Sequence, residues 1–468
     1  MKKNNDGIPK ITIGICLFHL LASRNIMTSD IFLLLRDASG IRLVLFVPSY
    51  KKDFFDRIYG SENVVIEGID EQIIDTFAFK FFKWLSFCLI PTYTVYLRHR
   101  ERLHRNPSFR GYVKYALSRM ISRLCARSRI VHTVTRACDE WFSSYSNLFP
   151  YLDRHQLDLL FVTDVFSEIE PIFLQAARKR GIRTVGMVRS WDNTTTKGLL
   201  RAIPDSIIVN NAIIAREAVQ FHDVPPKSIS VVGLPQFDMA CRNFNDNRAL
   251  FCRELGIDSA KDIIFFGPAG IFLSATDWQL CELLKRAVQD GTLPPSVHFI
   301  VSKHPGDPPI LNRFVPDEHF TIISIGTPFS VGPKVSEMTA LDQRFLVRCL
   351  FHSAIIMCVN STLGMDSLPF DKPQIMVEFD GWEQKPYIES VARYHDEDHM
   401  RKYLKTGAVR VVRTPDEWFY SIKKYLRNTA LDREKRARAA REQLFNLDGQ
   451  SGQRVAHHLL AVILQGKR

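Results

Sequence analysis

Along most of this 468-residue chain, short continuous apolar runs alternate with segments of helical character. Continuous apolar strands are typical of parallel sheets covered by helices on both faces, because neither side of such a strand meets water. The alternation therefore predicts an α/β protein with two Rossmann-like, doubly wound domains that face a cleft. The expected strands span residues 11–18, 41–47, 157–163, 183–188, 206–209, 228–232, 262–267, 297–303, 321–324, 354–359 and 374–377.

Breaks in this alternation indicate the domain organisation. We expect an N-terminal domain over residues 1–238, a C-terminal domain over 239–445 and a final helix over 446–468. The segment from about 71 to 150 lacks a convincing strand and carries apolar residues at helical spacing, so it predicts a helical insertion in the first domain. Residues 21–29 are expected to form a polar-tipped loop.

The positive charge of the chain is concentrated in this insertion. The whole chain has a net charge of +12, and the stretch from Lys80 to Arg129 contains twelve Lys and Arg residues against one acid, Glu101. Aromatic residues are interleaved with the basic ones, which favours an anionic membrane surface as the partner. A solvated helical face and nucleic-acid binding are the alternatives. We do not expect nucleic acid, because no RNA-binding module motif is present.

Cysteine spacing and missing motifs exclude several function classes. The nine cysteines form no CxxC pair and no zinc-type cluster, which favours a reducing cytosol. No apolar run reaches the ~18–20 residues of a membrane-spanning helix, so we expect a cytoplasmic protein, peripheral at the inner face of the plasma membrane. The P-loop, GxGxxG, HExxH and GxSxG motifs are absent, as is an Asp-x-Asp metal motif. Neither a metal nor a cofactor is expected.

Two loops of the second domain are candidate sites for a nucleotide diphosphate. After strand 354–359 come Asn360, Ser361, Thr362 and Gly364, and a helix is expected to begin at Met365. Helix N-termini bind anions through free backbone N–H groups, and hydroxyls add donors. The competing interpretation is a Ser/Thr helix cap with a structural glycine. Further candidates are Asp366 for ribose hydroxyls, Gly267 at the end of strand 262–267, and Lys303 and His304 at the end of strand 297–303.

The first domain offers candidates for acceptor binding and catalysis. A polar run from Arg189 to Gly198 follows strand 183–188, and a carboxylate there can act as a general base on an acceptor hydroxyl. The alternative is a purely structural role, in which the run forms an Asx-turn and its tryptophan packs in the core. We predict Asp192, Asp164 and His304 as catalytic residues, and Arg24, Asn25, Trp191, Asn193, Lys197 and Glu168 as acceptor-binding residues.

With these loops identified, the chain resembles the GT-B glycosyltransferase superfamily, in particular bacterial surface-polysaccharide transferases and CDP-glycerol glycerophosphotransferases. Lys303-His304-Pro305 is similar to a Lys/Arg-x-His-Pro loop that contacts donor phosphates. The segment from Asn360 to Gly364 is similar to the diphosphate-binding loop, and Asp448 to Arg454 to the signature that opens the last helix. The glycerophosphotransferases carry a His-Gly-Thr-Pro-x-Lys loop where this chain has Trp191 to Lys197, without the histidine.

The resemblance implies an inverting, metal-independent glycosyltransferase of bacterial cell-envelope polysaccharide biosynthesis. Its donor would be a nucleotide-sugar, which is a substrate and not a cofactor, and its acceptor a cell-surface glycan or a lipid-linked molecule. The alternatives are a CDP-glycerol-type glycerophosphotransferase, a UDP-sugar 2-epimerase, or a non-enzymatic protein that binds membrane or RNA through the basic insertion. The typical His-x-Glu-Ala-Gly loop of the epimerases is missing near Arg189–Asn193.

Overall fold

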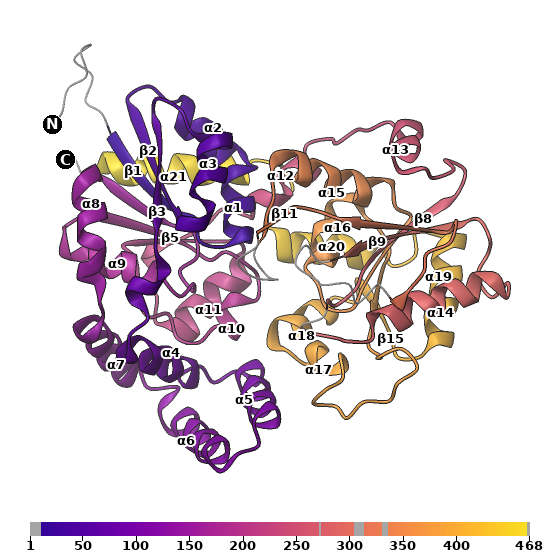
Figure 1. The fold of residues 1–468 in the computed structure, drawn as a ribbon, viewed down its shortest axis with the longest axis horizontal. Helices are drawn as coiled ribbons and strands as arrows, with labels where there is room; N and C mark the ends of the chain where they lie inside the picture. Colours follow the sequence, from indigo (N-terminus) through magenta and orange to yellow (C-terminus); the bar gives the residue numbers. More distant parts are fainter. Residues whose placement is uncertain (1–10, 271–272, 304–312, 330–335, 466–468) are drawn as a thin grey trace. The chain divides into compact units, whose positions relative to one another are not determined.

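In the computed structural model, the chain divides into two compact units, formed by residues 1–236 with 450–468 (unit 1) and by residues 237–449 (unit 2). The structure describes residues 11–270, 273–303, 313–329 and 336–465. Each unit contains a parallel sheet with helices packed on it (Figure 1). The last helix, α21 (Ser451–Gln465), belongs to unit 1 although it follows unit 2 in the sequence.

The seven parallel strands of unit 1 lie in the order β3-β2-β1-β4-β5-β6-β7. Adjacent positions such as Val44 and Leu45 are both fully buried, so the two faces of the sheet are covered, as the continuous apolar runs predict. The strands are β1 (Ile11–Cys16), β2 (Ile41–Pro48), β3 (Val64–Ile69), β4 (Leu159–Val162), β5 (Arg183–Met187), β6 (Ser206–Val209) and β7 (Ile229–Val231).

The helical insertion predicted over 71–150 is confirmed as helices α4 to α8, which connect β3 to β4. These helices are α4 (Phe77–Cys88), α5 (Tyr93–Arg105), α6 (Phe109–Cys125), α7 (Arg129–Phe142) and α8 (Phe149–His155). Helices α4 to α7 gather at one end of unit 1, at the lower left of Figure 1. The other helices of unit 1 before α21 are α1 (Leu20–Met27), α2 (Asp30–Asp37), α3 (Lys52–Tyr59), α9 (Glu170–Lys179), α10 (Asn193–Thr196) and α11 (Ala212–His222).

The main sheet of unit 2 has six parallel strands in the order β10-β9-β8-β13-β14-β15. They are β8 (Asp262–Gly267), β9 (Val297–Lys303), β10 (Phe320–Ser324), β13 (Ile355–Cys358), β14 (Gln374–Val377) and β15 (Val409–Val412). A small antiparallel pair consists of β11 (Thr327–Pro328) and β12 (Ser336–Glu337).

The helices of unit 2 include the charged C-terminal segment that follows residue 415. They are α12 (Asp238–Cys241), α13 (Arg248–Leu255), α14 (Asp277–Gln289), α15 (Ala340–His352), α16 (Leu363–Ser367), α17 (Ala392–His395), α18 (Asp398–Leu404), α19 (Pro415–Arg427) and α20 (Arg433–Leu444). Within the described residues, no helix has the length and apolar character needed to cross a membrane.

Three local expectations are corrected by the structure. Residues 21–29 do not form a loop, because most of them belong to helix α1, whose polar residues Ser23, Arg24 and Asn25 are buried. Strands β3 and β15 were not expected, although both consist largely of β-branched residues. The helix expected from Met365 begins at Leu363 and ends after five residues.

Candidate functional site

The residues that follow three neighbouring strands of unit 1 lie at one edge of its sheet. Strands β1, β4 and β5 are adjacent and parallel, so their carboxyl ends meet. His19 follows β1, Asp164 follows β4 and Arg189 follows β5. This edge is where ligands bind in doubly wound folds.

Arg189 connects these three strand ends. Its Nε donates to Asp164 Oδ2 at 2.7 Å, and its Nη1 lies 3.0 Å from His19 Nδ1. The Arg189–Asp164 ion pair is almost fully buried. Asn25 Nδ2 also donates to the Arg189 carbonyl oxygen at 3.1 Å. The guanidinium is therefore fixed at the sheet edge by groups from several elements.

His19 is the N-cap of α1 and lines the cavity described below. Its Nδ1 accepts from the Leu21 backbone N–H at 3.1 Å as well as from Arg189. Desolvation, followed by the charges of Arg189 and Lys197, lowers the pKa of His19 well below its ordinary value. The imidazole is therefore neutral at pH 7. Arg189 Nη1 lies near both ring nitrogens, but the Leu21 N–H donates to Nδ1 alone, which leaves the ring proton on Nε2.

Asp164 is buried, and donors engage both of its carboxylate oxygens. Besides the bond from Arg189 to Oδ2, Oδ1 accepts from the Phe166 backbone N–H at 3.1 Å and from Asn193 Nδ2 at 3.3 Å. The Asp164 N–H donates to Glu170 Oε2 at 2.8 Å. Burial, and then the charge of Asp164, raises the pKa of Glu170 well above its ordinary value.

Several buried acceptors around this network have no hydrogen-bond partner among the described residues. They are Asn25 Oδ1, Asn193 Oδ1 and Glu170 Oε1. Buried polar atoms are almost always paired in proteins, so a group of unpaired ones is a mark of a functional site. His19 and Glu170 were not predicted as site residues, although they stand one and seven residues after the ends of predicted strands.

The polar run from Arg189 to Gly198 is packed against the helical insertion. Thr92 Oγ1 donates to the Thr195 carbonyl oxygen at 2.8 Å, and the Leu199 N–H donates to the Ser86 carbonyl oxygen at 2.8 Å. Asp192 is half-buried and accepts from Thr196 Oγ1 at 3.1 Å. These backbone anchors hold the candidate base in a defined loop.

A cavity of about 710 Å³ lies between this sheet edge and the insertion. Its charged lining is dominated by cations: Lys80, Lys83, Arg98, Arg102, Lys114, Arg189, Lys197 and Arg201. The acids in the lining are Glu71, Asp164 and Glu168. The excess of cations makes the cavity suited to an anionic group.

Three of these cations, Arg102, Lys114 and Lys197, form no ion pair within the described part of the chain. The Arg102 guanidinium lies over the Phe87 ring, 4.2 Å from its centroid, and burial lowers the Arg102 pKa. By contrast, Lys83 is paired with Glu168, and Arg201 with Asp139 at 2.7 Å. The unpaired group is the part of the lining available to a ligand.

The structure therefore brings Asp164, predicted as catalytic, to one cavity with the predicted acceptor residues Glu168 and Lys197, and Asn193 is bonded to Asp164. Asn25 is bonded to Arg189, and Arg24 is buried in α1. Trp191 and Asp192 are half-buried in the polar run. These residues all belong to unit 1, whereas the predicted donor residues belong to unit 2.

The candidate donor loops of unit 2 also follow neighbouring strands. Strands β9, β8 and β13 are adjacent, so Lys303, Gly267 and the residues after Cys358 share one sheet edge. The Val359 N–H donates to the Gly267 carbonyl oxygen at 3.3 Å. A Cβ on Gly267 would lie 2.8 Å from Leu363 Cδ2, so a larger residue there would require the Leu363 side chain to shift.

The residues around α16 differ in accessibility. Asn360, Ser361 and Thr362 are half-buried, and Ser361 Oγ accepts from the Leu363 N–H at 3.1 Å, as a helix cap does. Asp366 is buried.

Gly364 is packed in the core of unit 2: a Cβ there would lie 2.9 Å from Gln374 Oε1. His304 lies outside the described residues. Within the ranges that the structure describes, no group of three or more His, Cys, Asp or Glu side chains could hold a metal ion.

No protein-family model matches this chain, and no curated protein matches its sequence. The fold is nevertheless shared with solved structures. The chain is similar to a UDP-N-acetylglucosamine 2-epimerase, with a TM-score of 0.56 at 11% identity over 98% of both chains. It is also similar to the UDP-GlcNAc 2-epimerase from Neisseria meningitidis bound to UDP-GlcNAc, with a TM-score of 0.55 at 11% identity over 96% of this chain and 100% of that chain.

A third similar structure is a variant of the wall teichoic acid polymerase TagF, with a TM-score of 0.50 at 10% identity over 99% of this chain and 91% of that chain. Identities this low establish the architecture alone. The chain therefore has the GT-B-like fold of two parallel-sheet units, as the sequence predicted.

Proposed function

We propose that this protein is a glycosyltransferase that transfers a sugar from a nucleotide-sugar donor to an acceptor hydroxyl. The observation that carries the proposal is the cluster of His19, Arg189 and Asp164 at the edge of a cation-rich cavity. The GT-B-like fold supports it, because the similar structures include a UDP-GlcNAc 2-epimerase bound to UDP-GlcNAc and a polymerase of wall teichoic acid.

The proposed reaction proceeds in one displacement. The acceptor oxygen bonds to the anomeric carbon while the bond from that carbon to the diphosphate breaks, and its electron pair leaves with the diphosphate. The hydroxyl proton passes to Asp192, whose carboxylate is half-buried, whereas Asp164 is fully buried and pairs with Arg189. Asp164 is thus a positioning residue for Arg189 in this scheme.

In unit 2, the donor diphosphate would be held by Lys303 and His304, by the hydroxyls of Ser361 and Thr362 and by the backbone N–H groups that follow Asn360. Charge and preorganised donors at the leaving group lower the barrier without a metal. Transfer would occur with inversion, because one displacement inverts the anomeric carbon. The acceptor in this proposal is a cell-surface glycan or a lipid-linked molecule.

The cavity in unit 1 supports an acceptor that carries a phosphate or carboxylate group. Arg102, Lys114 and Lys197 line it without ion-pair partners in the described structure, and His19 offers an Nε2 donor at the same wall. Charge-assisted hydrogen bonds to such a group are about twice as strong as neutral ones. Lys114→Gln should therefore raise the KM for an anionic acceptor and leave the KM for the donor unchanged.

The test of the proposal is turnover of nucleotide-sugars by purified protein, with and without acceptor. Asp192→Asn should abolish transfer and keep donor binding, and the exposed Asp153→Asn on α8 serves as the matched control. Ser361→Ala and His304→Ala should weaken donor binding. Full turnover by Asp192→Asn would remove the base assignment, and unaltered donor affinity in both other variants would remove the donor site.

A UDP-sugar 2-epimerase is the second candidate, favoured by the TM-scores of 0.56 and 0.55 to epimerase structures. The two activities differ in their need for an acceptor. An epimerase converts UDP-GlcNAc to its 2-epimer with no acceptor present, whereas a transferase leaves the sugar unchanged. Proton exchange at C2 of the sugar in deuterated water would decide for the epimerase.

A further inference from the structure

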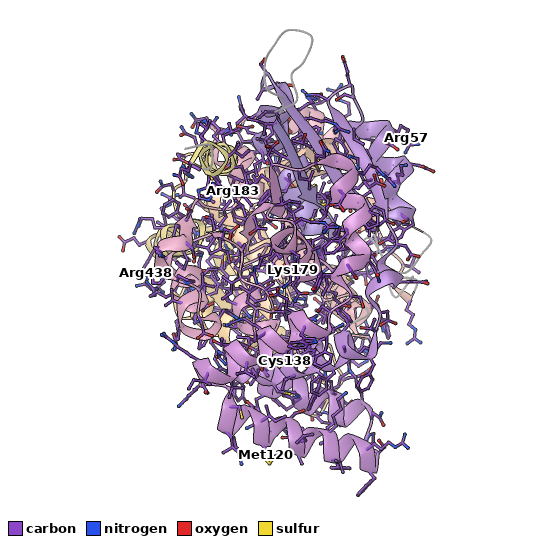
Figure 2. The ribbon with its side chains drawn as sticks, turned by 90° about the vertical axis from the view of Figure 1, so that its left-hand side faces the viewer. Arg57, Met120, Cys138, Lys179, Arg183 and Arg438 are labelled. Atoms are coloured by element: carbon purple, nitrogen blue, oxygen red, sulfur yellow. The ribbon has the colours of Figure 1, made fainter. Side chains whose placement is uncertain are left out.

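Helix α6 exposes an apolar stripe on the side that faces away from the rest of unit 1. The stripe consists of residues 4, 4, 3 and 4 positions apart, which places them on one face of the helix. We call it the outer stripe; its members are Phe109 (83% exposed), Val113 (51%), Leu117 (40%), Met120 (52%) and Leu124 (76%). In Figure 2, Met120 lies at the lower edge of unit 1, on the helix farthest from its strands.

The opposite face of α6 is occupied by its own packing. Ser118 is buried and accepts from Trp84 Nε1 of α4 at 3.0 Å. Ile121 and Cys125 pack against the small apolar cluster that contains Phe87. The orientation of α6 is therefore fixed by these contacts, and the outer stripe is a second apolar face of the same helix.

Basic side chains flank the outer stripe on both sides. At about 100° per residue, Arg110 lies along one border of the stripe and Arg123 along the other, whereas Lys114 lies on the side of the helix that lines the cavity. Helix α6 contains no acidic residue. Helix α7 also exposes apolar side chains: Ile130, Val134 and Trp141 are exposed by 78%, 55% and 84%.

We propose that the outer stripe and its basic borders bind the surface of an anionic lipid bilayer. Apolar side chains on such a helix enter the boundary between headgroups and acyl chains, while Arg and Lys extend to the phosphates. Each basic residue close to an anionic surface strengthens binding roughly fivefold. This binding surface is independent of the proposed transferase chemistry, and none of its five stripe residues lines the cavity.

The residues of the outer stripe and its borders favour an anionic bilayer over a second copy of the chain or single-stranded nucleic acid. A second copy of the same face would bring Arg and Lys against Arg and Lys, and no acid on α6 could compensate them. Single-stranded nucleic acid would satisfy the basic residues but stacks on aromatic rings, whereas Phe109 is the one aromatic member of the stripe and its other four members are aliphatic or thioether side chains. A bilayer with anionic headgroups satisfies both parts of the surface.

The experiment is co-sedimentation of the full chain with vesicles of phosphatidylcholine, alone or with 30% phosphatidylglycerol. The protein should bind the anionic vesicles at least tenfold more tightly, and added salt should weaken the binding. Arg110→Gln with Arg123→Gln should weaken it about 25-fold. Met120→Ser with Leu124→Ser should weaken it about tenfold, because the removed apolar surface no longer enters the bilayer.

Matched controls separate this surface from general charge and hydrophobicity. Arg57→Gln on α3 (Figure 2) and Leu341→Ser on α15 change exposed residues of the same types elsewhere, and should leave vesicle binding unchanged. An equal loss of vesicle binding in the control variants, or no binding of the wild type to anionic vesicles, would overturn the proposal. So would binding only to single-stranded RNA, or dimerisation that Met120→Ser with Leu124→Ser abolishes.

Discussion

Gly198 is the position where the acceptor loop and the helical insertion come closest, and its substitution offers a quantitative test of that packing. Its φ is +95°, which L-residues rarely adopt. A Cβ would lie 2.9 Å from Phe87 Cα and 3.0 Å from Phe87 N, both of them backbone atoms that cannot turn away. Gly198→Ala therefore combines backbone strain with a clash.

The expected loss of unfolding free energy in Gly198→Ala is the sum of these two contributions. A left-handed conformation costs a non-glycine residue roughly 1–2 kcal/mol. Moving two packed backbones apart by several tenths of an ångström adds roughly 1–3 kcal/mol. Gly181→Ala is the matched control, since Gly181 has a φ of +65° but no atom within 4 Å of the added Cβ, so only the first contribution applies.

Urea unfolding of both variants measures the difference. We expect Gly198→Ala to lose about 2–5 kcal/mol of unfolding free energy and Gly181→Ala about 1–2 kcal/mol. Gly198→Ala should also reduce turnover, because the loop carries Asp192 and Lys197. Equal losses of stability in the two variants would refute the close approach between the loop and α4.

Two further predictions concern pH. Burial lowers the pKa of His222 to about 3, and its Nδ1 accepts from the Leu200 N–H. The unfolded chain therefore binds a proton below about pH 6.5 that the folded chain does not, and the free energy of unfolding falls by about 2 kcal/mol from this group between pH 6.5 and 5. Urea unfolding of His222→Gln at several pH values should show a free energy of unfolding that depends less steeply on pH between 6.5 and 5. The same pH dependence as in the wild type would contradict the buried neutral imidazole. For Glu170, the pKa in the folded chain is raised above the pKa in the unfolded chain. As the pH rises, the carboxyl of the unfolded chain ionises first, so the free energy of unfolding of the wild type falls until the pH passes the pKa of the folded chain. Glu170→Gln should gain stability relative to the wild type from pH 4 to pH 8, and a constant difference would show that Glu170 does not titrate in this range.

The fold was predictable from the sequence because its strands are buried on both faces. Runs such as those of β2 and β8 contain almost no polar residue, so their pattern needs no tertiary information. Helix α1 was missed because its sequence places Ser23, Arg24 and Asn25 together, and such residues usually mark loops. In the structure all three are buried beside the site, which is where local sequence rules fail most often.

The candidate site was predictable only in part. Strand ends identify the loops, and this reasoning proposed Asp164 as a site residue but named Arg189 only as the first residue of the polar run. It could not find the pairing between them, because the donors that engage both oxygens of Asp164 come from segments up to 29 residues away. His19 was passed over because a single histidine carries little signal, and its environment of Arg189 and Lys197 exists only in the folded chain.

The central claim is that the protein uses a nucleotide-sugar, and ligand-dependent thermal stability tests it most directly. The panel consists of UDP, CDP, CMP and GDP with their sugar or glycerol conjugates. A ligand at ~100 times its Kd adds ~2.7 kcal/mol to the free energy of unfolding. We expect a clear rise in Tm with the nucleotides of one base, and a smaller rise in Ser361→Ala. No rise with any member of the panel would contradict the claim.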